Sequence, residues 1–180
     1  CANASVFDLL KADHRKVEKL FAALEHAEGE EKVSLARAIC IELSVHAEAE
    51  ERAFYPAARE ALDEEGDDLV KEAIVEHRTL KQLIADIDGS SPKQDLFEAN
   101  LKVLEEYVKH HVKEEEDELF PKLEATDFDE IAIGEKLAGV KARLMKKVED
   151  QPIRKGAQTV NVPALAGPAA TKTKTKAAAK

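Results

Sequence analysis

The sequence is poor in cysteine and in aromatic residues. Its 180 residues include two cysteines, no tryptophan and only 4% aromatic residues. Cys1 and Cys40 cannot form a disulfide framework, and Cys40 falls in an apolar helical stretch where a buried free thiol is the ordinary interpretation. We therefore expect a reducing compartment, the cytoplasm. A chain that starts at Cys1 leaves open a processed lipoprotein, a tag remnant or an altered first residue.

Long hydrophobic runs are also absent. No stretch approaches the roughly 20 apolar residues that a helix needs to span a bilayer. No positively charged start followed by an apolar segment resembles a signal peptide. The sequence therefore predicts a soluble protein without a membrane span.

Proline is scarce before residue 150, where only three occur, and charged residues make up 36% of the chain. Leucine, alanine, glutamate and lysine are abundant, and these residues favour helix. No boundary rich in proline, glycine or serine interrupts this region, and its length suits one domain. An all-α fold is the simplest prediction.

The formal net charge of -10 is unevenly distributed. Residues 151–180 contain six Lys or Arg and no acid, which leaves 21 bases and 37 acids in residues 1–150. The last segment has too little apolar bulk to bury, so we expect a domain over 1–150 and a disordered basic tail over 151–180. Such a tail attracts nucleic acid or anionic lipid weakly, or contacts the acidic domain itself. We expect no specific nucleic-acid function.

The apolar periodicity predicts four long helices and a weaker fifth. Pro56 should kink the second helix or interrupt its hydrogen bonds. We expect an antiparallel four-helix bundle built from two helical hairpins, followed by a short extra C-terminal helix. The predicted helices span about residues 5–27, 30–62, 67–87, 93–123 and 129–148.

One short pattern, H-x3-E-x5-P, occurs twice, 65 residues apart. The first copy has His46, Glu50 and Pro56, and the second has His111, Glu115 and Pro121. Residues four apart lie on one face of an α-helix, so each copy directs an imidazole and a carboxylate to the same side. A lone histidine precedes each copy by a similar distance: His14 lies 32 residues before His46, and His77 lies 34 residues before His111.

Four of the six histidines therefore fall on the apolar stripes of four successive helices. One inward histidine is more often a hydrogen-bonded core residue than a metal ligand, but this combination is poorly explained by packing alone. Unpaired Glu50 and Glu115 would each cost on the order of several kcal/mol in a core, and two dications would neutralise them. Imidazole and carboxylate without thiolate suit iron, manganese or zinc, and a carboxylate from each half can bridge two ions.

At these residues the sequence resembles the hemerythrin-like HHE cation-binding family. That family has the pattern His, His-x3-Glu, His, His-x3-Glu across a four-helix bundle, and the segments at 50–56 and 115–121 are similar to its motifs. The resemblance covers about residues 5–148. It implies a non-haem di-iron centre, oxo- or hydroxo-bridged, with iron favoured over zinc or manganese. The implied terminal ligands are His14, His46, His77 and His111, and the implied bridging ligands are Glu50 and Glu115.

The sequence departs from the oxygen-carrying hemerythrins at two points. They have another histidine one turn from the third-helix ligand, where this chain has Ala73 and Lys81. They also place the last carboxylate five residues after the last histidine, which would select Glu116, but the first copy of the motif favours Glu115. Water, an oxygen donor or Tyr107, one turn before His111, are candidates for the missing ligand. The alternative for Tyr107 is a core tyrosine with its hydroxyl hydrogen-bonded at the bundle edge.

The remaining histidines, His26 and His110, lie off the inward stripes and are expected to face solvent. The glutamates next to the motifs should form an acidic surface, some of them orienting ligands. The leading hypothesis is a di-iron protein that binds, senses or reacts with O2, peroxide or NO. The alternatives are a peroxide-decomposing or NO-handling oxidoreductase, and an iron-responsive or iron-holding module. Turnover and oligomeric state, monomer or weak dimer, stay open.

Overall fold

The structure, a computed structural model, describes residues 4–151, 158–163 and 165. Helices dominate these residues, and no strand occurs among them. This confirms the predicted all-α fold. The elements are α1 (Val6–Leu24), α2 (Gly29–Ala49), η1 (Glu50–Phe54), α3 (Tyr55–Ala61), α4 (Glu64–Ile87), α5 (Phe97–Glu114), η2 (Glu115–Leu119), α6 (Phe120–Glu124) and α7 (Glu130–Glu149).

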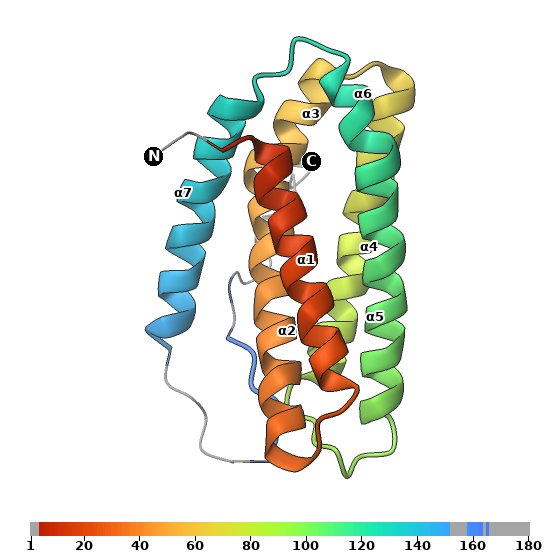
Figure 1. The fold of residues 1–180 in the computed structure, drawn as a ribbon, viewed down its shortest axis with the longest axis vertical. Helices are drawn as coiled ribbons and strands as arrows, with labels where there is room; N and C mark the ends of the chain where they lie inside the picture. Colours follow the sequence, from red (N-terminus) through yellow and green to blue (C-terminus); the bar gives the residue numbers. More distant parts are fainter. Residues whose placement is uncertain (1–3, 152–157, 164, 166–180) are drawn as a thin grey trace, which may run out of the picture.

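The elements form an antiparallel four-helix bundle with a fifth helix outside it (Figure 1). The four bundle helices are α1, α2 with its continuation η1 and α3, α4, and α5 with its continuation η2 and α6. α1 packs on α2, and α4 packs on α5, which are the two predicted hairpins. α7 packs against α1, α2 and η1.

Side-chain caps mark the starts of some of the helices, among them α1 and α4. The Ser5 hydroxyl accepts a hydrogen bond from the Phe7 amide at the start of α1. Asp63 accepts one from the Gly66 amide at the start of α4. These side chains satisfy amides that have no partner within the first helical turn.

The second and fourth predicted helices are not continuous α-helices. Each contains five residues of π-helix, η1 and η2, directly before Pro56 and Pro121. Proline has no amide hydrogen, and its ring crowds the carbonyl four residues earlier, so the regular pattern fails there. In η1 the Tyr55 amide instead donates to the carbonyl of Glu50, five residues back. Each π segment therefore begins at the glutamate of an H-x3-E motif.

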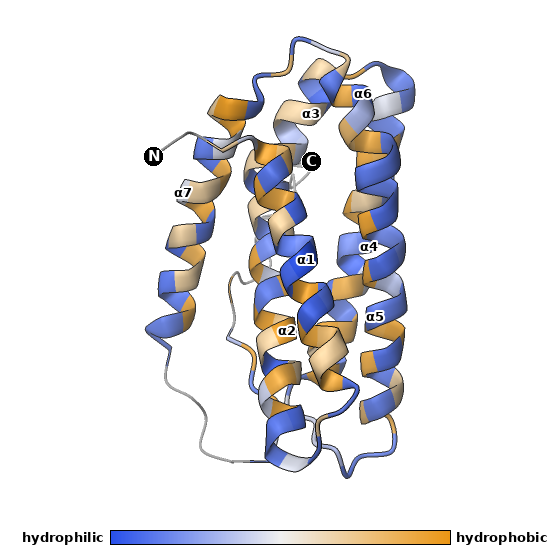
Figure 2. Cartoon of the chain, in the orientation of Figure 1, coloured by the Kyte–Doolittle hydropathy of each residue, from blue (hydrophilic) through white to orange (hydrophobic). Residues whose placement is uncertain are grey.

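The buried apolar side chains form two clusters with a polar layer between them. On α1, Leu10 belongs to one cluster and Val17 to the other, with His14 between them. On α4, His77 lies between Ala73 and Leu80 in the same way. Figure 2 shows the hydrophilic middle of α1, where this layer crosses the bundle. The polar layer is therefore sealed by hydrophobic packing at both ends.

The chain after α7 differs in part from the predicted disordered tail. Val160 is buried in one apolar cluster, and its amide and carbonyl bond the carbonyl of Ser90 and the amide of Gly89. Arg37 donates from Nε to the Asn161 carbonyl at 2.8 Å. These contacts hold residues 158–163 against α2 and the loop between α4 and α5. Val160 is a single apolar residue in a segment that is otherwise poor in them, so the average composition of the segment did not indicate its burial. Residues 152–157, 164 and 166–180 of the predicted tail lie outside the described residues, as does Cys1.

Among the described residues, no helix combines the length and the apolar character that crossing a membrane would need.

Candidate metal centre

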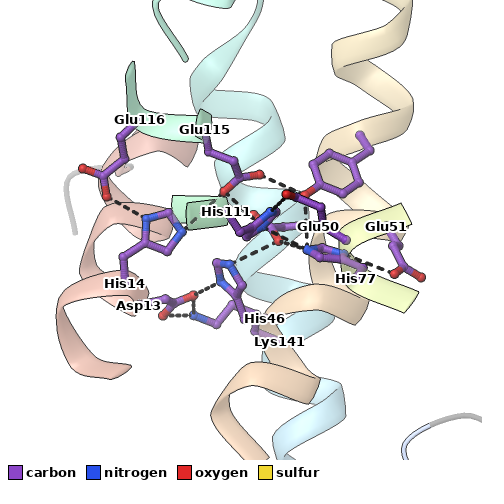
Figure 3. Close-up of polar contacts among 12 residues, drawn as sticks. Asp13, His14, His46, Glu50, Glu51, His77, His111, Glu115, Glu116 and Lys141 are labelled. Atoms are coloured by element: carbon purple, nitrogen blue, oxygen red, sulfur yellow. Dashed lines mark hydrogen bonds and ion pairs between the residues drawn. The ribbon is translucent and has the colours of Figure 1, made fainter. Parts of the chain in front are cut away.

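All six residues predicted as ligands are buried in the middle of the bundle, and their polar ends converge (Figure 3). Their exposed fractions range from 0% to 6%. Each comes from a different turn of the bundle helices, so four segments distant in sequence meet at one point. The six residues are His14 on α1, His46 on α2, Glu50 on η1, His77 on α4, His111 on α5 and Glu115 on η2.

The six residues form two groups that share Glu50. In the first, His14, His46, Glu50 and Glu115 each offer a ligand atom within 4.8 Å of the others. In the second, His77 and His111 join Glu50 within the same distance. The first group draws on both halves of the chain, and the second does as well. The geometry thus offers two adjacent positions, each with two imidazoles.

Each glutamate lies against one histidine of each position. Glu50 Oε2 is 3.2 Å from His46 Nε2 and 3.4 Å from His77 Nε2. Glu115 Oε2 is 3.5 Å from His14 Nε2 and 3.8 Å from His111 Nε2. Both carboxylates therefore lie between the two positions, as bridging ligands of a dinuclear centre do.

Several polar atoms at the centre have no hydrogen-bond partner, although they are fully buried. Leaving such atoms unpaired in an apolar interior is costly. They all belong to the first of the two groups, where a cation would be a partner for them. The atoms are His14 Nε2, His46 Nε2, Glu50 Oε1 and Oε2, and Glu115 Oε2.

In each of the four histidines of the centre, the Nδ1 atom faces a carboxylate. His14 Nδ1 lies 2.7 Å from Glu116 Oε1, and His111 Nδ1 lies 2.7 Å from Glu76 Oε2. His46 Nδ1 lies 3.3 Å from Asp13 Oδ2. His77 Nδ1 lies 3.2 Å from Glu51 Oε1. A carboxylate at Nδ1 fixes the tautomer and leaves the Nε2 lone pair directed inward, as metal-binding histidines require.

Sequence reasoning placed Glu51 and Glu116 among the acidic neighbours, some of which orient ligands, but it missed Asp13 and Glu76. Both missed residues directly precede a ligand histidine, His14 or His77. Each holds the histidine on the next helix of its own half, whereas Glu51 and Glu116 each hold a histidine of the other half. The sequence signal that could have identified these residues is the repeat of an acidic residue directly before His14 and His77, and of a second glutamate directly after Glu50 and Glu115.

Burial and neighbouring charges shift the pKa values of the ionisable groups at the centre. Burial and the neighbouring charge of Glu115 raise the pKa of Glu50 well above its usual range. Burial opposes ionisation of Glu115 too, but His111 and His14 outweigh it and hold its pKa below the usual range. Burial lowers the pKa of His46 to about 4, despite its hydrogen bond to Asp13. Without a cation, the two carboxylates therefore do not ionise equally.

The tyrosine at the centre is Tyr55, not Tyr107. The Tyr55 hydroxyl donates to Glu115 Oε1 at 2.9 Å and lies 3.3 Å from His77 Nε2. Its ring is 1% exposed. Tyr107 is only half-buried, and among the described residues no hydrogen bond joins it to the centre. The π turn of η1 explains the difference, because it brings the residue five positions after Glu50 back toward the centre.

A small cavity adjoins the four histidines on their apolar side. It has about 10 Å³ of room for the centre of a water-sized molecule, which is space for roughly one such molecule. The apolar side chains that close it belong to the cluster that contains Val17 and Leu80. Its lining includes the four histidines, Asp13, Val17, Leu43, Leu80, Val108 and Val112.

The two histidines expected at the surface, His26 and His110, are both exposed. His110 Nε2 nevertheless lies 3.1 Å from Glu114 Oε1 and 3.6 Å from Glu76 Oε1. Cys40 is fully buried in an apolar cluster, and burial raises the pKa of its thiol to about 12. A thiolate ligand is therefore not offered at this centre.

Comparison with known proteins agrees with this geometry. Residues 5–123 match the family described as the hemerythrin HHE cation binding domain. A curated relative from Nostoc, named DNA nickase, is 33% identical over 117 residues, which are 64% of this chain and 32% of the relative. The chain thus spans about a third of that relative. A solved hemerythrin HHE cation-binding domain protein homologue from Mycobacterium kansasii has the same fold, with a TM-score of 0.68, 22% identity and coverage of 82% of this chain and 94% of its own.

Proposed function

This chain belongs to the hemerythrin HHE cation-binding family, and we propose that it holds two iron ions and binds or reacts with a small oxidant or gas. The proposed ligands are the four histidines with inward Nε2 atoms and the two glutamates between them. The proposed small molecule is O2, peroxide or NO. The metal-binding unit is proposed to lie within residues 1–150.

One observation carries the metal proposal: five polar atoms are buried at one point without a partner. Hydrogen bonding within the protein does not account for them, and water-sized room is scarce there. A pair of dications would neutralise two carboxylates and accept four imidazole nitrogens. Nitrogen and oxygen donors without thiolate suit iron, manganese or zinc, and the resemblance to the hemerythrin-like family is the reason for proposing iron. Bound iron would supply redox chemistry.

The protein residues around this point have distinct tasks. The two glutamates would tie the two positions together, and the four carboxylates at Nδ1 keep the imidazoles oriented. The hydrophobic clusters at both ends exclude water from the layer between them. Tyr55 places one oxygen donor beside His77, in the half that lacks the additional histidine of oxygen carriers.

The size and character of the cavity favour a small ligand. A volume that holds about one water-sized molecule admits a two-atom ligand but no organic substrate. Its apolar walls, including Leu43 and Val108, suit O2 or NO better than a charged species. Peroxide remains the second candidate because the Tyr55 hydroxyl provides a proton-bearing group within the centre. Peroxide decomposition is therefore the proposed alternative activity.

We do not propose DNA nicking, the activity in the name of the Nostoc relative, for this chain. The match covers about a third of that protein. Residues 1–150 here are strongly acidic, with 37 acids against 21 bases, and such a surface repels a polyanion.

The proposal is tested by metal analysis of protein purified without added metal, beside the double variant His46→Ala/His111→Ala. His26→Ala is the control, because His26 is exposed and lies outside the centre. We expect about two irons per chain, lost in the double variant and kept in the control, with an absorption spectrum that peroxide changes. Iron-free protein that takes up no ferrous iron would refute the proposal. Sustained O2 release from peroxide would select the enzyme over a carrier or an iron-holding module.

A further inference from the structure

Each of the four carboxylates that hold the histidines has a basic side chain beside it. Lys81 Nζ lies 2.7 Å from Glu51, and Arg15 Nη2 lies 2.5 Å from Glu116. His110 Nε2 lies 3.6 Å from Glu76. These three neighbours come from α4, α1 and α5, which are helices of the bundle itself.

Asp13 differs, because its cation comes from outside the bundle. The Lys141 ammonium group on α7 donates to both carboxylate oxygens of Asp13. Asp13 Oδ2 in turn faces His46 Nδ1 at 3.3 Å. Figure 3 shows the chain of contacts from Lys141 through Asp13 to His46, at the edge of the centre.

α7 is held in place by its own packing. Leu137, Val140 and Leu144 are buried in the same apolar cluster as Phe7 and Val45 of the bundle. Gly134 fits closely against the backbone of residues 4–6. Residues 130–149 nevertheless lie beyond 5–123, the segment that matches the family. An element outside the matched domain therefore contacts the surroundings of the metal centre.

We propose that Lys141 is a positioning residue for the metal centre, acting through Asp13 on His46, so that α7 is part of the site. This inference rests on the proposed metal function. The proposed metal site would then include Lys141, which lies outside both H-x3-E motifs, and α7, which lies outside the matched segment 5–123.

The physical reason is the position of Asp13. Its carboxylate is largely buried, with 14% of the side chain exposed, so an unpaired charge there is costly. Lys141 compensates that charge and holds both oxygens, which fixes the direction of the oxygen that accepts from His46. Without Lys141, Asp13 can turn toward solvent, and that change releases the His46 ring.

The test is Co²⁺ titration of the metal-free protein, followed by visible absorption, which reports both affinity and ligand geometry. The variants are Lys141→Met, Lys141→Arg and Lys147→Met. Lys147 is the matched control because it lies on the same helix and is exposed. We expect Lys141→Met to weaken Co²⁺ binding about tenfold and to shift the Co²⁺ bands, since carboxylates that orient ligands contribute about 10- to 100-fold. Lys141→Arg should recover most of the affinity, and Lys147→Met should match wild type.

A double-variant comparison separates positioning from general stability. In the Asp13→Asn background, Lys141→Met should cause no further loss of Co²⁺ affinity, because its effect passes through Asp13. Thermal unfolding of each metal-free protein is measured in parallel. Equal Co²⁺ affinity and spectra for Lys141→Met and Lys147→Met would overturn the inference, as would an undiminished effect of Lys141→Met in the Asp13→Asn protein. Wild-type protein that binds no Co²⁺ and no iron would instead refute the proposed function.

Discussion

Tyr55 and Phe120 occupy equivalent positions in the two halves of the chain, 65 residues apart, but only Tyr55 directs an oxygen into the centre. Each follows a π segment, and its amide donates to the carbonyl of the motif glutamate. The Phe120 ring instead lies nearly parallel to the His14 ring, with centroids 6.3 Å apart. The two halves of the repeat therefore differ by one hydroxyl group, and the two groups of candidate ligands have chemically different surroundings.

Tyr55→Phe should make the two positions more alike. The variant keeps the ring packing against Phe54 and removes the hydroxyl that donates to Glu115. In this structure the hydroxyl is hydrogen-bonded, at 2.9 Å from Glu115 Oε1 and 3.3 Å from His77 Nε2. If it binds iron in the loaded protein, a visible charge-transfer band of wild type disappears in Tyr55→Phe. Absorption spectra and iron affinity of the loaded protein measure the effect. Tyr107→Phe is the control, because the chain has only two tyrosines and Tyr107 lies outside the centre. A band that survives both substitutions would exclude a tyrosine ligand.

Glu50→Gln should stabilise the metal-free protein while it abolishes tight metal binding. In the metal-free fold, burial raises the pKa of Glu50 above its usual 4.5, so the folded state binds more protons than the unfolded state above that pH. Stability from this group is present below pH 4.5 and is lost as pH rises through the folded pKa. The substitution removes that loss. At pH 7 the metal-free variant should therefore be more stable than the metal-free wild type.

The pH dependence distinguishes this mechanism from a general effect of removing a negative charge. Urea unfolding of metal-free wild type and Glu50→Gln should give nearly equal stabilities near pH 4 and a gap that widens toward pH 7. Glu118→Gln removes the same charge from an exposed position and should show no such gap. A gap that is constant with pH would mean that ionisation of Glu50 does not limit the metal-free fold.

Glu76→Gln should weaken metal binding without removing a ligand. Glu76 Oε2 lies 2.7 Å from His111 Nδ1, and the side chain is 9% exposed. Loss of its charge reduces the basicity of the imidazole and the strength of its orientation, which we expect to cost about 10- to 100-fold in affinity. Competitive titration with a chelator measures it. Glu72→Gln, one turn earlier and exposed, should leave the affinity unchanged; equal losses in both variants would point to the acidic surface instead.

The helices and the inward residues were predictable because they depend on spacing within one helix. His46 and Glu50 are four residues apart and so lie on one face of the helix. In the structure, His46 Nε2 is 3.2 Å from Glu50 Oε2. The bundle followed from the apolar stripes of four successive helices. These features need no knowledge of how one helix is rotated against the next.

The features that escaped prediction all depend on contacts between helices or on a change in helical period. Asp13 and Glu76 reach histidines on a neighbouring helix, at a distance along the chain that no local pattern encodes. Tyr55 points away from Glu50 in a regular α-helix, and only the π turn before Pro56 brings it inward. Composition counted Val160 within a basic tail poor in apolar residues, although its burial depends on the apolar cluster it joins and on its backbone bonds to Gly89 and Ser90.

Two glycines on α7 should respond oppositely to the same substitution, which tests how closely this helix packs. A Cβ on Gly134 would clash with the Ala4 carbonyl oxygen and lie 3.1 Å from the Val6 amide nitrogen, both backbone atoms that cannot rotate away. Gly134→Ala should therefore destabilise the protein by about 1–3 kcal/mol.

A Cβ on Gly139 would have no atom within 4 Å apart from its own stretch of helix backbone, so alanine there gains only helix propensity. Gly139→Ala should stabilise by about 0.5–1 kcal/mol. Chemical denaturation of both metal-free variants gives the two changes directly. Because Gly134 lies two turns before Lys141 on the same helix, Gly134→Ala should also weaken Co²⁺ binding, while Gly139→Ala should not. Stabilisation by both substitutions would mean that the start of α7 is free to move away from α1, and that its contact with Asp13 is not held by this packing.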